Sequence, residues 1–323
     1  MESRADSCSL LPRSLFLSRF FPPGCVQTGS LSRIKGAERP PAVYSHPWMK
    51  RVLTALALIP LVLLLVFLGP KWLVVTATAA VAMLASWEFM NMAERGGAFP
   101  PKAAVLVAIA ALFFGDLLLP DETLVILGIL SLALLVYCTF FKPVDQMMAA
   151  AATSIFCIFY CGFTLLSVPA LREQSNGPSL VTFLLCAVWA GDIAALYVGK
   201  NLGRHKLAPS LSPNKSWEGS IGSVAGSLLV TGLLLVLARW MQSHDWAVLS
   251  FPEENWFWLS LAVLVNVAAQ VGDLAESALK RSVGVKDSGS LLPGHGGVLD
   301  RIDALLLAAP ALWYAQGIHL RLF

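Results

Sequence analysis

Charged side chains are scarce in this chain, and their scarcity excludes a soluble globular fold. Only 13% of the 323 residues are Asp, Glu, Lys or Arg, whereas soluble domains carry about 25%. Hydrophobic residues make up 57% of the sequence. Too few charged groups exist to cover a globule of this size, so the composition predicts that lipid covers much of the surface.

Cysteine and histidine are also few, and neither forms a metal-binding pattern. The chain holds six cysteines and five histidines. Cys157 and Cys161 lie one helical turn apart, but no further cysteine or histidine accompanies them. We therefore expect neither zinc nor a disulfide. No Ser-His-Asp or Cys-His arrangement indicates covalent catalysis, and no internal repeat of a transporter kind is visible.

Apolar stretches that can cross a bilayer recur at short intervals along the chain. A spanning helix needs about 20 mostly apolar residues. The stretches lie at 53–69, 73–92, 103–119, 123–141, 148–170, 179–199, 220–240, 256–279 and 303–318. The predicted fold is therefore an all-α polytopic membrane protein with about nine transmembrane helices.

Residues 1–48 differ from the rest, because they are rich in Ser, Pro and Arg and contain no apolar run of spanning length. A misassigned start codon, a disordered arm and a targeting peptide all fit this composition. Met49-Lys50-Arg51 followed by an apolar stretch is typical of the start of a membrane protein, and we favour a true start there. The expected organisation is an N-terminal extension at 1–48 and a single transmembrane domain at 49–323.

Lysine and arginine gather in alternate connections between the predicted helices. The richer set of connections holds Lys50, Arg51, Arg95, Lys102, Lys142, Lys200, Arg204, Lys206, Lys215, Lys280, Arg281, Lys286 and Arg301. The opposite set holds Lys71, Arg172 and Arg239. Because cytoplasmic connections carry the excess of positive charge, we expect the N-terminus in the cytoplasm and the C-terminus outside.

A stripe of polar residues marks the predicted helix near 256–279. Its members, spaced by three or four residues so that they share one face, are Asn266, Gln270, Asp273, Ser277 and Lys280. A carboxylate within a membrane costs about 2.5 kcal/mol or more, so Asp273 needs a partner or a wet cavity. Either a polar seam between helices or the wall of a cavity open to the cytoplasm would explain the stripe.

The connection at 280–302 gathers acids, bases and glycines, a composition suited to nucleotide phosphates. Its lysine and arginine side chains supply positive charge and donors for phosphate oxygens. The Gly294–Gly297 segment allows the backbone to approach a ligand and to present N–H groups to an anion. Asp300 and Asp303, at the start of the next helix, add the carboxylate oxygens that Mg²⁺ prefers.

The segment from Ser277 to Asp303 resembles the signature of the phosphatidate cytidylyltransferase family, also called CDP-diacylglycerol synthases. That pattern is S-x-x-K-R, four residues, K-D-x-G, and then P-G-H-G-G-x-x-D-R-x-D, and each fixed position is met. The stretches around Asp192 and from Ser212 to Gly219 are similar more loosely. Many relatives have Lys-Lys-Thr where this chain has Asn214-Lys215-Ser216. The resemblance extends over residues 49–323 and is strongest in the last third.

The resemblance implies a multi-pass enzyme of the cell inner membrane, often a homodimer, with its active site facing the cytoplasm. Such an enzyme would transfer CMP from CTP to phosphatidate, using Mg²⁺ with or without a second cation. Its partners would be CTP, phosphatidate and membrane lipid, and no nucleic acid. The implied metal ligands are Asp273 and Asp300. The implied catalytic residues are Asp273, Asp300, Lys280, Arg281, Lys286, Asp287, His295 and Asp303. The implied substrate-binding residues are Asp192, Lys215, Ser277, Arg301, Gly296 and Gly297.

Two kinds of alternative fit the same sequence. One is another CTP-using lipid enzyme, such as a lipid or prenol kinase or a related lipid cytidylyltransferase. The other is an ion-coupled transporter, because buried acids in membrane helices also mark ion pathways. The clustering of charges toward one face, rather than at mid-membrane, favours the enzyme.

Overall fold

A computed structural model of the chain describes residues 59–246, 248–289, 291 and 296–322. All of them belong to one compact unit, Ser45–Phe323. The expected N-terminal extension at 1–48 lies outside the described residues.

The described residues are mostly helical. The helices are Ile59–Leu68, α2 (Lys71–Arg95), α3 (Lys102–Leu118), α4 (Thr123–Phe141), α5 (Val144–Cys157), α6 (Thr164–Arg172), α7 (Gly177–Leu202), α8 (Trp217–Ser243), α9 (Asn255–Ser282) and α10 (Leu299–Leu322). A 3₁₀ turn η1 (Pro120–Glu122) precedes α4, and a π-helical turn η2 (Ile158–Phe163) joins α5 to α6. Each apolar stretch predicted from the sequence coincides, where it is described, with a helix.

Within the described ranges, six helical segments are long and apolar enough to cross a membrane. They are α2, Pro120–Phe141, Val144–Arg172, α7, α8 and α9. The surface of α4 is apolar as well, with Leu124, Leu132 and Phe140 exposed. Such a surface suits contact with lipid, as expected of an all-α membrane protein.

A two-stranded hairpin departs from the predicted all-helical class. Strands β1 (Lys206–Ala208) and β2 (Ser212–Ser216) pair antiparallel in the connection between α7 and α8. The segment contains none of the long apolar runs from which the helices of this chain were predicted. Its sequence therefore gave no indication that two strands pair here. It matters for function because β2 carries Lys215.

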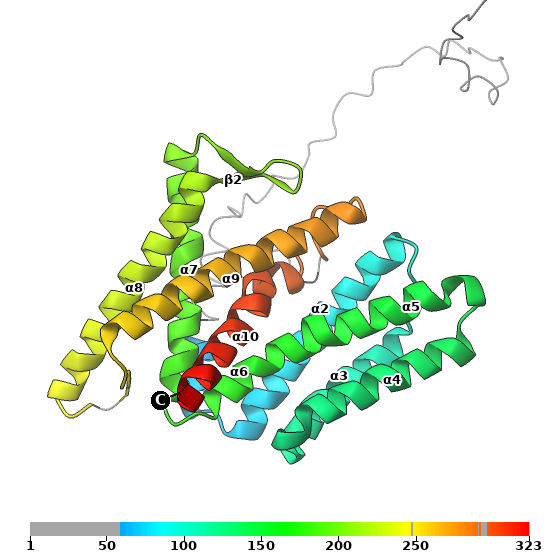
Figure 1. Ribbon diagram of the computed structural model, residues 1–323, viewed down its shortest axis with the longest axis horizontal. Coiled ribbons are helices and arrows are strands. Elements are labelled where there is room, and N and C mark those ends of the chain that lie inside the picture. The colour runs from blue at the N-terminus through cyan, green and yellow to red at the C-terminus, as the bar shows by residue number, and fades with distance from the viewer. Residues whose placement is uncertain (1–58, 247, 290, 292–295, 323) are drawn as a thin grey trace, which may run out of the picture. The chain divides into compact units, whose positions relative to one another are not determined.

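Small residues allow α7 and α8 to pack closely along their lengths (Figure 1). A Cβ atom added at Gly226 of α8 would lie 2.5 Å from the Cβ of Ala194 on α7, and one at Gly222 would lie 2.7 Å from the Cβ of Val198. Membrane helices associate through such small residues, because close backbone approach replaces the hydrophobic driving force available in water. Helix α9 packs against both α8 and α10, so the start of α10 meets the later part of α9.

Candidate active site

The first half of the polar stripe on α9 joins this helix to α8. The buried Asn266 amide donates to the hydroxyls of Ser223 (2.9 Å) and Ser227 (2.8 Å). The Gln270 amide donates to Asn266 Oδ1 at 2.7 Å and accepts a hydrogen bond from Ser220. This part of the stripe is therefore a seam between helices, one of the two explanations expected from the sequence.

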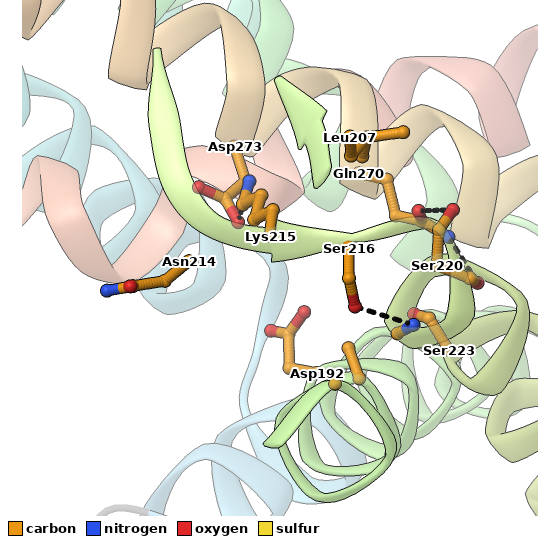
Figure 2. A pocket seen from close by; sticks show the side chains of 12 residues that line it. Asp192, Leu207, Asn214, Lys215, Ser216, Ser220, Ser223, Gln270 and Asp273 are labelled. Atoms are coloured by element: carbon orange, nitrogen blue, oxygen red, sulfur yellow. Dashed lines mark hydrogen bonds and ion pairs between the residues drawn. The ribbon is translucent and has the colours of Figure 1, made fainter. Parts of the chain in front are cut away.

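The middle of the stripe, Gln270 and Asp273, lines a cavity of about 100 Å³ between α7, α8, α9 and the hairpin. Asp273 of α9 and Lys215 of β2 form an ion pair across it, with 2.5 Å between Nζ and Oδ2. Their side chains are 36% and 26% exposed, so the pair remains accessible from the cavity. Figure 2 shows Asp192 pointing from α7 into the same space. Three residues expected at the site thus come together here.

Local hydrogen bonds at the start of α8 hold the hairpin over this cavity. The Ser216 hydroxyl caps α8 by accepting from the Gly219 N–H at 3.1 Å. The Glu218 carboxylate accepts from the backbone N–H groups of Arg204 (3.1 Å) and His205 (3.2 Å), and it lies 2.6 Å from Nδ1 of His205. Lys215 directly precedes the cap, so the beginning of α8 fixes its place.

A second cluster of charges lies between the end of α9 and the start of α10. The Lys280 ammonium pairs with Asp300 at 2.7 Å and with Glu276 one turn earlier on its own helix. Asp300 also accepts from the backbone N–H groups of Gly297 (2.8 Å) and Ser288 (3.0 Å). Its side chain is 8% exposed. Two backbone N–H groups of this connection, those of Ser288 and Gly297, are thus bound to the Asp300 carboxylate. The expected presentation of the Gly294–Gly297 backbone to a ligand stays a prediction.

The two carboxylates expected to hold metal each pair with a different lysine. Asp303 lies one turn after Asp300 on α10, half-buried, and it interacts electrostatically with both Asp273 and Asp192. Within the described part of the chain, no three Asp, Glu, His or Cys side chains form a ready-made metal site.

The other expected site residues differ in their contacts and exposure. Arg281 donates to the carbonyls of Leu211 (3.3 Å) and Val285 (3.1 Å), which ties the hairpin to the connection after α9. Ser277 is half-buried on α9, and Gly296 adopts a left-handed conformation (φ 80°). Lys286, Asp287 and Arg301 are exposed, as are Arg281 and Asp192. His295 lies outside the described residues.

Two buried carboxylates were not singled out from the sequence. Glu276 is fully buried beside Lys280, and Glu88 of α2 is 2% exposed. A signal was present in both cases, since a carboxylate in an apolar helical stretch needs partners and is therefore a candidate functional residue. The polar stripe predicted on α9 included Ser277 and not its neighbour Glu276.

Comparison of the sequence with known proteins identifies a family and several relatives of this chain. Residues 49–319 match the model of the Cytidylyltransferase family. A phosphatidate cytidylyltransferase of Brucella melitensis is 48% identical over 161 residues, 50% of this chain and 55% of that protein, so the chain spans about half the length of this relative. Phosphatidate cytidylyltransferases of Synechocystis and Haemophilus influenzae are each 32% identical, over 82% of this chain and 95% and 97% of their own lengths.

Proposed function

Because this chain belongs to the cytidylyltransferase family, we propose that it transfers CMP from CTP to phosphatidate, forming CDP-diacylglycerol and pyrophosphate. The observation that carries the proposal is the pairing of acids with lysines in two clusters, Lys215 with Asp273 beside the cavity and Lys280 with Asp300 between α9 and α10. Both substrates are anions, and they approach each other only where fixed positive charge offsets their repulsion. The two lysines, together with a cation bound by their acidic partners, would provide that charge.

In the proposed reaction, a phosphate oxygen of phosphatidate bonds to the α-phosphorus of CTP while the bond from that phosphorus to the bridging oxygen of the β-phosphate breaks. The nucleophile is already an anion, so no strong base is needed. Catalysis then consists of positioning and charge stabilisation. We assign Lys215 to one phosphate group at the cavity, and Lys280, Arg281 and Lys286 to the triphosphate and the lipid phosphate.

The donor set also suits Mg²⁺, for which we propose Asp273 and Asp300 as ligands. The Asp273 carboxylate faces the cavity, and Mg²⁺ commonly takes one or two carboxylates together with water and substrate phosphates. A carboxylate offers about four acceptor positions, and Asp300 already accepts from Lys280, Ser288 and Gly297. A cation at Asp300 would thus compete mainly with the Lys280 ammonium. When bound, Mg²⁺ would supply charge neutralisation and alignment of the attacking and leaving oxygens.

We further propose that the chain is a multi-pass protein of the cell inner membrane, with about nine spanning helices and its active site on the cytoplasmic side. The distribution of lysine and arginine supports this orientation. It also agrees with the location of the cavity at the end of α9 where Lys280 and Arg281 lie. Cytoplasmic CTP and membrane-bound phosphatidate would both reach a site at that boundary.

Labelled nucleotide distinguishes this reaction from its rivals. Purified protein is incubated with phosphatidate, Mg²⁺ and CTP that carries label on either the α- or the γ-phosphate. We expect α-label in the lipid fraction and γ-label in pyrophosphate. Incorporation of γ-label would indicate a lipid kinase, and an absence of label in lipid from either nucleotide would favour transport or another activity.

A further inference from the structure

A buried carboxylate of α2 is enclosed by the connection between α9 and α10. Glu88 Oε2 accepts from the Ser288 hydroxyl at 3.2 Å and from the Leu299 backbone N–H at 2.9 Å. These partners lie 200 and 211 residues further along the chain. The only carboxylate that α2 buries therefore contacts a segment that the family resemblance places at the active site.

Two glycines of that segment are explained by this carboxylate. A Cβ atom added at Gly289 would lie 2.3 Å from Glu88 Oε1, and one at Gly297 would lie 2.3 Å from Oε2. Real Cβ atoms do not approach so closely, so glycine at these positions allows the backbone to close on Glu88. At Gly297 an added Cβ atom would also lie 2.1 Å from the Ser288 hydroxyl. A side chain at either glycine would therefore displace Glu88 or Ser288 from the contact they make.

The residues that contact Glu88 also hold Asp300. Ser288 directs its hydroxyl to Glu88 and its backbone N–H to Asp300. Gly297 packs on Glu88 and donates its N–H to Asp300, and Leu299, which donates to Glu88, directly precedes Asp300. Asp300 in turn binds Lys280. A short series of hydrogen bonds thus links α2 to the acid and the lysine assigned to catalysis.

Packing alone does not account for a carboxylate at this position. A buried charge is costly unless hydrogen bonds compensate for its lost hydration, and an apolar side chain would fill the same space more cheaply. We infer that Glu88 is a positioning residue for the transfer reaction: by fixing Ser288 and Leu299, it orients Asp300 and Lys280 toward the substrates. This inference rests on the proposed function.

The test compares Glu88→Gln with Glu94→Gln on the same helix. Glu94 pairs with Lys102 at 2.6 Å, outside both clusters, and is the matched control. Both hydrogen bonds to Glu88 end on Oε2. Gln has nearly the shape of Glu and could keep an oxygen there, but as a neutral acceptor it would form bonds only about half as strong. We expect Glu88→Gln to lower kcat about 10- to 100-fold, as mutation of a supporting hydrogen-bond partner at a metal site does, with KM for CTP and the melting temperature little changed. Glu94→Gln should leave all three as in wild type.

Hydrogen exchange provides a readout that does not depend on turnover. Faster exchange of the Ser288 and Leu299 amides in Glu88→Gln, but not in Glu94→Gln, is expected if Glu88 fixes the segment. Unchanged exchange, or wild-type kcat in folded Glu88→Gln, would overturn the inference. If wild type itself transfers no CMP, the proposed function fails, while the exchange result still decides whether Glu88 holds the segment.

A second variant covers the case in which Glu88→Gln does not fold. Ser288→Ala removes only the hydroxyl that contacts Glu88 and leaves the backbone N–H on Asp300. It should lower kcat by a smaller factor and speed exchange of the Ser288 amide. Where Glu88→Gln does fold, combining the two changes should lower kcat no further than Glu88→Gln alone. Independent effects that multiply in the double variant, or wild-type kcat in Ser288→Ala, would show that Glu88 does not act through this residue.

Discussion

Replacing Asp273 by Asn tests the centre of the proposed chemistry. The change keeps the shape of the side chain and removes one charge of the pair with Lys215. Because both partners are roughly one-quarter to one-third exposed, the pair contributes at most about 1 kcal/mol to folding. That loss is small against the about 5–15 kcal/mol that stabilises a typical native protein. The variant should therefore accumulate in the membrane at a near-normal level.

Catalysis should respond very differently. If the Asp273 carboxylate holds a cation that stabilises transferring phosphate by about 4 kcal/mol, its loss lowers the rate about 10³-fold. The assay measures transfer of α-labelled CMP into lipid by purified wild type and Asp273→Asn over a range of Mg²⁺ concentrations. A higher Mg²⁺ requirement in the variant would identify the metal as the lost partner.

The matched control is Asp116→Asn. Asp116 of α3 lines a separate cavity near the start of α2 and accepts a hydrogen bond from Thr123 at 2.5 Å. Its replacement should leave the rate and the Mg²⁺ dependence unchanged. Near-wild-type turnover by folded Asp273→Asn at ordinary Mg²⁺ concentrations would refute the reasoning, because no cation essential for transfer could then depend on this carboxylate.

Three further perturbations probe other parts of the same picture. Lys215→Ala should mainly raise KM for CTP or phosphatidate, because a phosphate contact made in the ground state is lost. Steady-state kinetics with each substrate varied will test this. A lower kcat with unchanged KM would show instead that the lysine acts only in the transition state. Chelation with EDTA should abolish CMP transfer, and added Mg²⁺ should restore it. Ca²⁺, with its longer bonds and looser geometry, should restore less activity. Transfer that does not depend on metal would exclude the proposed role of Asp273 and Asp300. Gly226→Val should destabilise the protein by about 1–3 kcal/mol through overpacking, seen as a lower melting temperature in detergent, while the same change at Gly232, where an added Cβ atom would meet nothing within 4 Å, should have little effect.

The helices were predictable from sequence because membrane spans are encoded by their own composition. Each apolar stretch became helical where it is described, since lipid leaves backbone N–H and C=O groups no other partners. The hairpin at 206–216 was not predicted. Its strands are short, and their pairing depends on the cap at Ser216 and on Glu218, which are contacts that no local periodicity reveals.

The polar stripe shows how far a periodic pattern can be interpreted. Periodicity placed Asn266 and Asp273 on one face of α9, and the structure confirms that both project toward neighbouring groups of α8 and the hairpin. It could not show which members of the stripe bind serines of α8 and which face the cavity, because that depends on the positions of α8 and β2, which are distant in sequence from the stripe. The contact of Glu88 with Ser288 spans 200 residues and was likewise invisible to local spacing.

The glycine contacts between α7 and α8 have a consequence for the membrane in which the protein works. Asp192 lies on α7 and Lys215 is attached to the first turn of α8, so the sliding of one helix along the other would change the separation of these side chains. Gly222 and Gly226 lock the two helices in a single register. A bilayer whose thickness forces spanning helices to tilt would therefore tilt α7 and α8 as a pair, and the geometry between their polar ends would be preserved across membranes of different lipid composition.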